Sequence, residues 1–261
     1  MIIDFHTHCF PDALAARAIG ALQKAGGNIP AHSDGTAGGL IASMDRDGVD
    51  ISVVLCIATN AHQQHSVNDF AASIQSDRLI CFGSVHPESP DALEELDRIQ
   101  SLGLRGVKFH PEYQNFFVDD EKMKPIYKKI SQLGLPTVFH AGYDLAYGAP
   151  VHCSPQRLAR ALRWFDSPVV AAHWGAWCDW EGVLQHLCGL PLYFDTSFGQ
   201  GSIPTPFAKE IVRRHGTQRI VFGSDSPWHT PRQDMEFVKS ILPQAQADAV
   251  LGQNAQALLG L

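Results

Sequence analysis

Short apolar runs alternate with longer amphipathic stretches along the whole chain, and the alternation occurs eight times. Each run is almost continuously apolar and rich in β-branched residues, as in parallel strands that are buried on both faces. The eight runs are residues 2–5, 51–57, 79–85, 104–109, 136–139, 169–172, 191–194 and 219–222. This alternation predicts a parallel sheet whose strands are connected by helices.

The stretches between these runs carry helical patterns. Apolar residues in one stretch fall at i, i+3, i+4, i+7 and i+10, which marks one face of a helix: Met123, Ile126, Tyr127, Ile130 and Leu133. Ser154 followed by Pro155 supplies an N-cap and a first-turn proline for another helix. Residues 88–101 and 248–261 also indicate helices.

Eight strand–helix units favour a closed (β/α)8 barrel of the TIM type over an open doubly wound α/β sheet. No Gly-x-Gly-x-x-Gly motif follows the first strand, so a dinucleotide-binding fold has no support. No Pro/Ser-rich linker interrupts the 261 residues, and we expect residues 1–261 to form one domain. Residues 11–39 are irregular, and we interpret them as a long first βα connection and a candidate lid. Residues 248–261 are expected to close the outside of the barrel.

Composition and charge narrow the class of protein. Hydrophobic residues make up 45% of the chain and charged residues 18%, which is typical of a soluble globular protein. The formal net charge of −7 leaves no basic surplus, so we expect a small-molecule substrate and no nucleic-acid partner. No run reaches the roughly 20 apolar residues of a membrane span. The six cysteines form no CxxC pair, which is typical of reduced thiols, and we expect a cytoplasmic protein. We expect no membrane partner. The sequence leaves open whether the protein forms a homo-oligomer.

Candidate metal ligands stand at the C-terminal ends of the predicted strands, where barrel enzymes carry their active residues. His6 and His8 end the first strand, and residues two apart on a strand face the same way. His140 ends the fifth strand, His173 the sixth and Asp225 the eighth. A lone histidine at a strand end is more often structural, but five such residues at four strand ends favour a metal centre. Imidazole and carboxylate groups suit zinc or a similar divalent ion.

The motifs that contain these residues resemble those of a known family. They are IDFHTH at 3–8, GVKFHP at 106–111, FHAG at 139–142, AHWG at 172–175, FGSDSP at 222–227 and GQNAQALLGL at 252–261. In this order they are similar to the amidohydrolase superfamily, and to its amidohydrolase-related branch that includes aminocarboxymuconate-semialdehyde decarboxylase.

The resemblance implies roles for the same residues. It implies that His6, His8, His140 and Asp225 hold the metal, and that His173 is a general base or an electrostatic stabiliser. In binuclear relatives the residue that matches His173 binds a second metal, and Asp225 is also implied to move a proton. We expect one Zn²⁺, with two ions as the alternative.

Lys108, His110, Glu112 and Trp174 are candidates for contact with substrate or a second metal. A lysine near position 108 is carboxylated in binuclear relatives; the alternatives are an ion pair or an ammonium that binds a substrate carboxylate. We favour an unmodified Lys108. His110 and Glu112 are candidates to line the pocket, orient a ligand or bind substrate; the alternative for Glu112 is a solvated loop residue. Aromatic residues at the same rim are expected either to wall the pocket or to pack the barrel top: Tyr113, Phe116, Tyr143, Trp174, Trp177 and Trp228.

Two reactions fit such a site. The first is hydrolysis of a small amide, ester or lactone by a metal-activated water, with His173 and Asp225 handling protons. The alternative is non-oxidative decarboxylation of a small aromatic or muconate-type carboxylic acid, for which Lys108 or Arg105 could bind the carboxylate if it faces the pocket. The acidic charge disfavours a metal-dependent deoxyribonuclease. A non-catalytic binding module would leave the complete ligand set unexplained. We expect the hydrolase.

Overall fold

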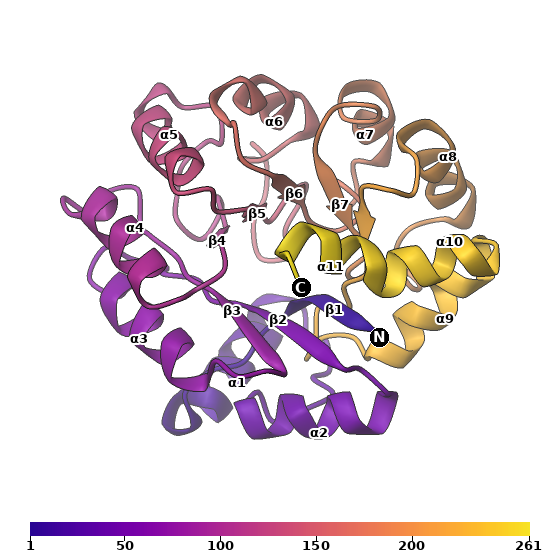
Figure 1. Ribbon diagram of the computed structural model, residues 1–261, viewed down its shortest axis with the longest axis horizontal. Helices are drawn as coiled ribbons and strands as arrows, with labels where there is room; N and C mark the ends of the chain where they lie inside the picture. Colours follow the sequence, from indigo (N-terminus) through magenta and orange to yellow (C-terminus); the bar gives the residue numbers. More distant parts are fainter.

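Eight parallel strands form a barrel in the computed structural model, which describes residues 1–261 (Figure 1). The strands are β1 (Ile3–Thr7), β2 (Ile51–Leu55), β3 (Leu79–Phe82), β4 (Val107–Phe109), β5 (Thr137–Phe139), β6 (Val169–Ala171), β7 (Tyr193–Asp195) and β8 (Ile220–Val221). They pair in the order β1-β2-β3 and β4-β5-β6-β7-β8. Single parallel bridges join the two groups, Gly83 to Val107 at one seam and Thr7 to Ser226 at the other. The predicted TIM-type α/β fold is confirmed.

Helices surround the strands (Figure 1). They are α1 (Asp12–Ala25), α2 (Ala37–Asp47), α3 (Gln64–Ile74), α4 (Ala92–Ser101), α5 (Lys124–Gln132), α6 (Pro155–Ala161), α7 (Trp180–His186), α8 (Thr205–His215), α9 (Pro231–Ile241), α10 (Gln244–Asp248) and α11 (Asn254–Leu259), with the short helices η1 (Glu121–Met123), η2 (Leu162–Trp164) and the π-helical η3 (Ala249–Gln253). The Ser154 side chain caps α6 by accepting from the Arg157 amide, as predicted. No helix is both long and apolar enough to span a bilayer.

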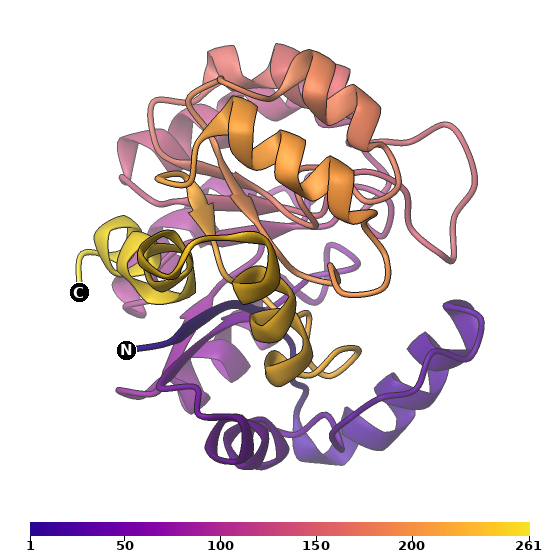
Figure 2. The ribbon, with the colours of Figure 1, turned by 90° about the vertical axis from the view of Figure 1, so that its right-hand side faces the viewer.

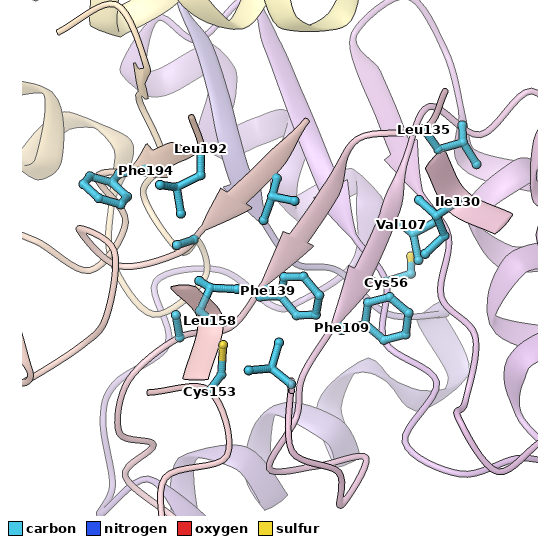
Figure 3. Packing of buried hydrophobic residues seen from close by; sticks show 14 of the residues in the cluster. Cys56, Val107, Phe109, Ile130, Leu135, Phe139, Cys153, Leu158, Leu192 and Phe194 are labelled. Atoms are coloured by element: carbon cyan, nitrogen blue, oxygen red, sulfur yellow. The ribbon is translucent and has the colours of Figure 1, made fainter. Parts of the chain in front are cut away.

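The barrel buries side chains on both faces of its strands. Phe109 and Phe139 lie between the strands and the surrounding helices, where Ile130 and Leu158 belong to the same apolar cluster (Figure 3). Burying one such side chain stabilises the fold by about 1.5–3 kcal/mol. Because successive side chains alternate, Lys108 faces the barrel interior between two residues that face the helices. The pleat of β4 therefore directs this ammonium group into the barrel.

The C-terminal segment lies across one end of the barrel, not along its outside as expected. Ala255 and Leu259 of α11 pack with the interior residues Ile3, Phe5 and Val221. Figure 1 shows α11 beside the N-terminus of the chain, close to the axis of the barrel. The segment fills this end because its apolar face continues the barrel's inner core. The floor of the barrel is thereby closed.

Residues 11–39 contain a regular helix, which corrects the expectation of an irregular connection. Ala15 and Ile19 of α1 are buried and anchor the helix. Gly35, with φ of 77°, lies so close that a Cβ atom there would come within 2.7 Å of Ile19. Figure 2 shows α1 projecting at one end of the molecule, together with the loop that follows β5. Both segments lie at the C-terminal ends of the strands, where the candidate site is found.

Candidate metal centre

A register shift in β1 positions the His-x-His pair. The pairing of β1 with β2 shifts between Asp4 and Thr7, while the Thr7 hydroxyl donates to the Val53 carbonyl. Such shifts re-aim side chains at the rims of barrels. His6 and His8 consequently line the same cavity, as predicted from their spacing.

Hydrogen bonds fix which nitrogen of each imidazole faces the cavity. Nδ1 of His6 lies 2.7 Å from Oδ2 of Asp195, and Nδ1 of His8 lies 2.9 Å from the Leu55 carbonyl. Both partners accept, so both Nδ1 atoms carry the proton and both Nε2 atoms present lone pairs. The two Nε2 atoms are 3.2 Å apart. Two lone pairs at this separation repel each other unless a cation lies between them.

The carboxylate of Asp225 completes this arrangement. Its Oδ1 lies 3.4 Å from Nε2 of His6 and 3.3 Å from Nε2 of His8. Ligand atoms bound tetrahedrally to zinc at about 2.0–2.1 Å are roughly 3.3–3.4 Å from one another. The three atoms therefore have the spacing of one face of a zinc coordination shell, and this donor set fits a divalent cation.

His140 and His173 form a second pair of facing nitrogens. Nε2 of His140 donates to the Tyr143 carbonyl at 3.2 Å, which leaves Nδ1 as an acceptor, 3.1 Å from Nε2 of His173. The ring centroids of His173 and His6 are 5.0 Å apart. The predicted ligands are thus brought together in part. His6, His8 and Asp225 lie within ligand distance of one another, while His140 lies outside that group, next to His173.

Burial sets the protonation of these imidazoles. His6, His140 and His173 are buried, and desolvation holds the pKa of each well below its ordinary value. Neighbouring imidazoles and the Lys108 ammonium lower each pKa further. The rings are therefore neutral at pH 7, which is the form that binds a metal.

Two site residues adopt the left-handed backbone conformation. The φ angles are 59° at His173 and 66° at Asp225, values that are uncommon outside glycine. The His173 amide donates to Oδ1 of Asp195 at 2.9 Å, and the Asp225 amide donates to the His6 carbonyl at 2.8 Å. These bonds hold backbone strain at the point where function needs a fixed side-chain direction.

Asp195 and Ser197 are site residues that sequence reasoning missed. Asp195 is fully buried at the end of β7, where one oxygen accepts from His6 and the other from the amides of His173 and Ser197. The Ser197 hydroxyl donates to Asp195 and lies 2.8 Å from Nδ1 of His173. Asp195 directly follows the apolar run 191–194, so the strand-end rule applied to the other candidates would have found it.

Lys108 faces the site and Arg105 does not. The Lys108 side chain is 1% exposed and its Nζ lies 3.4 Å from Nε2 of His6. Burial lowers the pKa of Lys108 to about 8, although Asp195 and Asp225 oppose the shift. The Arg105 guanidinium donates instead to the Leu259 carbonyl at the barrel floor. Of the two cationic candidates, only Lys108 can meet a ligand at the metal centre.

The remaining candidates separate into two groups. His110 lines the cavity, stacked against Tyr113 and His140 at centroid distances of 3.6 Å and 4.0 Å. Glu112 and Trp174 are buried and do not line the cavity; for Trp174 this agrees with the alternative that it packs the barrel top. Glu112 accepts from the His152 amide at 2.9 Å. Trp174, whose φ of 59° turns it away from the site, is buried and packs against Phe237.

The candidate ligands, together with Lys108 and His110, lie at the inner end of a cavity of about 510 Å³. Four of the six predicted rim aromatics line it: Tyr113, Tyr143, Trp177 and Trp228. Phe116 instead joins Trp174 in the apolar core. The outer walls come from α1, from α3 with the residues that precede it, and from the loop after β5. The cavity thus has a polar inner end and a mostly apolar approach.

The barrel with a histidine and aspartate centre at its C-terminal rim is the architecture of a metal-dependent enzyme. The amidohydrolase family model matches residues 3–261, and the chain belongs to this family. It is accordingly an enzyme of the amidohydrolase superfamily, whose members typically use a divalent metal. A comparison with curated protein sequences found no match to this chain.

Solved structures share the fold over the full length. The 5-carboxyvanillate decarboxylase of Sphingomonas paucimobilis is 15% identical, with a TM-score of 0.73 over 100% of this chain and 99% of that one. The 2,6-dihydroxybenzoate decarboxylase of Rhizobium is 16% identical, with a TM-score of 0.74 over 99% and 98%. A probable 2-pyrone-4,6-dicarboxylic acid hydrolase of Acinetobacter baumannii is 18% identical, with a TM-score of 0.68 over 100% and 99%. At these identities the likeness is one of fold.

Proposed function

We propose that this protein is a metal-dependent, non-oxidative decarboxylase of a small aromatic carboxylic acid. The observation that carries the proposal is the position of Lys108, which is the only lysine or arginine that lines the cavity and lies beside His6. A buried ammonium at this place is suited to a substrate carboxylate. Two of the fold relatives named above are decarboxylases of aromatic acids, which also supports this reaction over the hydrolysis expected from the sequence.

The ligands of the metal in this proposal are His6, His8 and Asp225, with His140 as the fourth. When bound, the divalent ion supplies a Lewis acid that stabilises negative charge on substrate oxygens. Asp195 keeps the His6 ring in the tautomer that offers Nε2, and the Leu55 carbonyl does the same for His8. The protein thus provides a preorganised set of donors without any change of protonation.

The chain's own residues orient the acid and deliver a proton. Lys108 binds the carboxylate and fixes the ring beside the centre. The bond between the ring carbon and the carboxyl carbon breaks, its electron pair stays on the ring carbon, and a proton joins that carbon as carbon dioxide leaves. Asp225 and His173 both line the cavity and are the candidates for passing on this proton. Because the carboxylate and the neutral imidazole hold no acidic proton at pH 7, either group first takes one up from solvent.

The second candidate function is hydrolysis of a small lactone, ester or amide. The same three donors fit it, and one fold relative is a probable hydrolase of a pyrone dicarboxylic acid. In this case Lys108 would bind a carboxylate remote from the scissile bond, while His173 and Asp225 would handle the protons of hydrolysis.

A product assay separates the two reactions. Protein loaded in turn with Zn²⁺, Mn²⁺ or Co²⁺ is incubated with hydroxybenzoic acids and with lactones and aryl esters. We expect carbon dioxide and the matching arene from the acids, and no such release by the Asp225→Asn variant. Ring-opened or de-esterified product without carbon dioxide would reject the decarboxylase and support the hydrolase.

A further inference from the structure

Helix α1 presents two apolar stripes that serve different purposes. Ala15 and Ile19 are buried and anchor the helix, as described above. Leu14, Ala18 and Leu22, spaced four residues apart, form a second stripe that lines the cavity. The Leu14 side chain is 53% exposed. Ala18 and Leu22 are half-buried, so the rest of the chain leaves this second stripe incompletely covered.

Other apolar side chains line the same cavity from different segments. Val67 and Phe70 of α3 contribute to the lining, as does Leu145 of the loop after β5. Leu145 is 49% exposed, and its Cδ1 lies 3.8 Å from where a Cβ atom on Gly26 would stand. The end of α1 and the β5 loop thus meet, and they give the cavity an apolar outer wall.

Charge is confined to other parts of the cavity. No acidic or basic residue of α1 or α3 lines it; the polar residues that do so from the α3 side are uncharged: Thr59, Gln63 and Ser66. Lys108 and Asp225 lie together at the metal centre, and Asp144 lies in the β5 loop. A volume of about 510 Å³ is in the range of sites for drug-sized ligands, larger than a ring with one carboxylate requires.

We propose that the substrate carries an extended apolar substituent, which lies along Leu14, Ala18 and Leu22 while its carboxylate meets Lys108. The carboxylate end of this assignment rests on the proposed decarboxylase function. The occupant is one small molecule because the apolar wall and the charged centre line a single continuous cavity. Scattered exposed apolar residues are ordinary on a protein surface, but here they converge on one concave site.

The test is a binding series on the zinc-loaded protein, measured by calorimetry. The probes are benzoate, 4-ethylbenzoate, 4-butylbenzoate and 4-hexylbenzoate, which share one head and differ in tail length. We expect affinity to rise by up to about fourfold for each methylene that becomes buried. Equal affinity for all four acids would overturn the proposal.

Matched substitutions assign the effect to the stripe. Leu14→Asp should weaken binding of 4-hexylbenzoate by about tenfold or more and leave benzoate unchanged, because it puts a charge in the path of the tail. Ala13→Asp adds the same charge at the neighbouring solvent-facing position and should change neither affinity. Ala18→Phe, which narrows the cavity without a charge, should act like Leu14→Asp. Loss of tail dependence in all three variants, or in none, would contradict the assignment.

The outcomes also separate this proposal from the proposed reaction. If the protein cleaves aryl esters with a preference for long tails and releases no carbon dioxide, the proposed decarboxylation is rejected and the proposed binding of an apolar tail along α1 is supported. If it decarboxylates short aromatic acids but its affinity does not depend on tail length, only the proposed binding of a tail along α1 is rejected. A dimer in light scattering that Leu14→Asp dissociates, without effect on tail dependence, would assign the stripe to a second copy and overturn the proposal.

Discussion

Asp195 accepts a 2.7 Å hydrogen bond from Nδ1 of His6, although 189 residues separate them in sequence. The pair links β7 to β1 at the candidate metal centre, and both side chains are buried. The same carboxylate also holds the backbone of His173. One residue outside the ligand set thus determines the direction of two imidazoles within the site.

Replacing Asp195 tests this relationship. Asp195→Asn removes the charge that holds the proton on Nδ1 of His6, so we expect zinc affinity to fall about 10- to 100-fold. Competition against a chelating dye measures the change. Ser197→Ala, which removes a neighbouring hydroxyl but keeps the carboxylate, should cost less. Equal zinc affinity in Asp195→Asn and the unmodified protein would show that the His6 tautomer needs no such support.

His140 and His110 are stacked on each other, yet only His140 is a predicted ligand. After loading with Zn²⁺ and removal of the excess, we expect His140→Ala to retain much less zinc than the unmodified protein and His110→Ala to retain as much, as measured by atomic absorption. His110, His140 and Asp144 form a separate group with ligand spacing. If His110→Ala lost zinc and His8→Ala retained it, the metal site would be assigned to His110, His140 and Asp144 instead.

Lys108 can be tested by a change that keeps its length and removes its charge. Lys108→Met should weaken benzoate binding by more than about tenfold, because the carboxylate loses its buried cation, while zinc content stays the same. Lys108→Arg is the control that keeps the charge and should bind benzoate more tightly than Lys108→Met. A large loss of zinc in Lys108→Met would instead support a metal-bridging role for this residue.

His215 makes stability depend on pH away from the site. Its ring stacks on Phe194 and its Nε2 donates to the Leu192 carbonyl, and burial lowers the pKa of His215 to about 4. The unfolded chain takes up this proton near pH 6.5. The contribution of the neutral ring to the free energy of unfolding is therefore fully present above pH 6.5. It falls by about 2–3 kcal/mol in total as the pH drops towards 4. Urea unfolding at pH 7 and pH 5 measures it, and His215→Gln should show the smaller difference. An equal difference in both proteins would contradict the assignment.

The strand-end rule predicts most of the site because a parallel barrel leaves little freedom. His6, His8, His173 and Asp225 lie where their runs end, and all line the cavity. The rule does not decide between the two alternatives for Trp174, since the left-handed turn at His173 and Trp174 directs that ring into the core and depends on hydrogen bonds to β7. Such a turn leaves no mark in the hydrophobic pattern.

Helix α1 was missed for a related reason. Its residues are rich in alanine, which gives little contrast between an apolar and a polar face, and they continue into Gly26 and Gly27. The helix is held by contact of Ile19 with the region of Gly35, which only the folded chain brings together. Strand boundaries show the same effect. The apolar run 51–57 exceeds β2 because Cys56 and Ile57 have left the strand to line the cavity.

The plug formed by Ala255 and Leu259 makes the barrel a blind tube. Small molecules can then reach the candidate metal centre only from the opposite end, where α1 and the loop after β5 frame the opening of the cavity. In the proposed decarboxylation, carbon dioxide and the arene would therefore leave through the same opening by which the acid enters. Leu14 and Leu145, which line the outer part of this cavity, would then contact the departing product as well as the arriving acid.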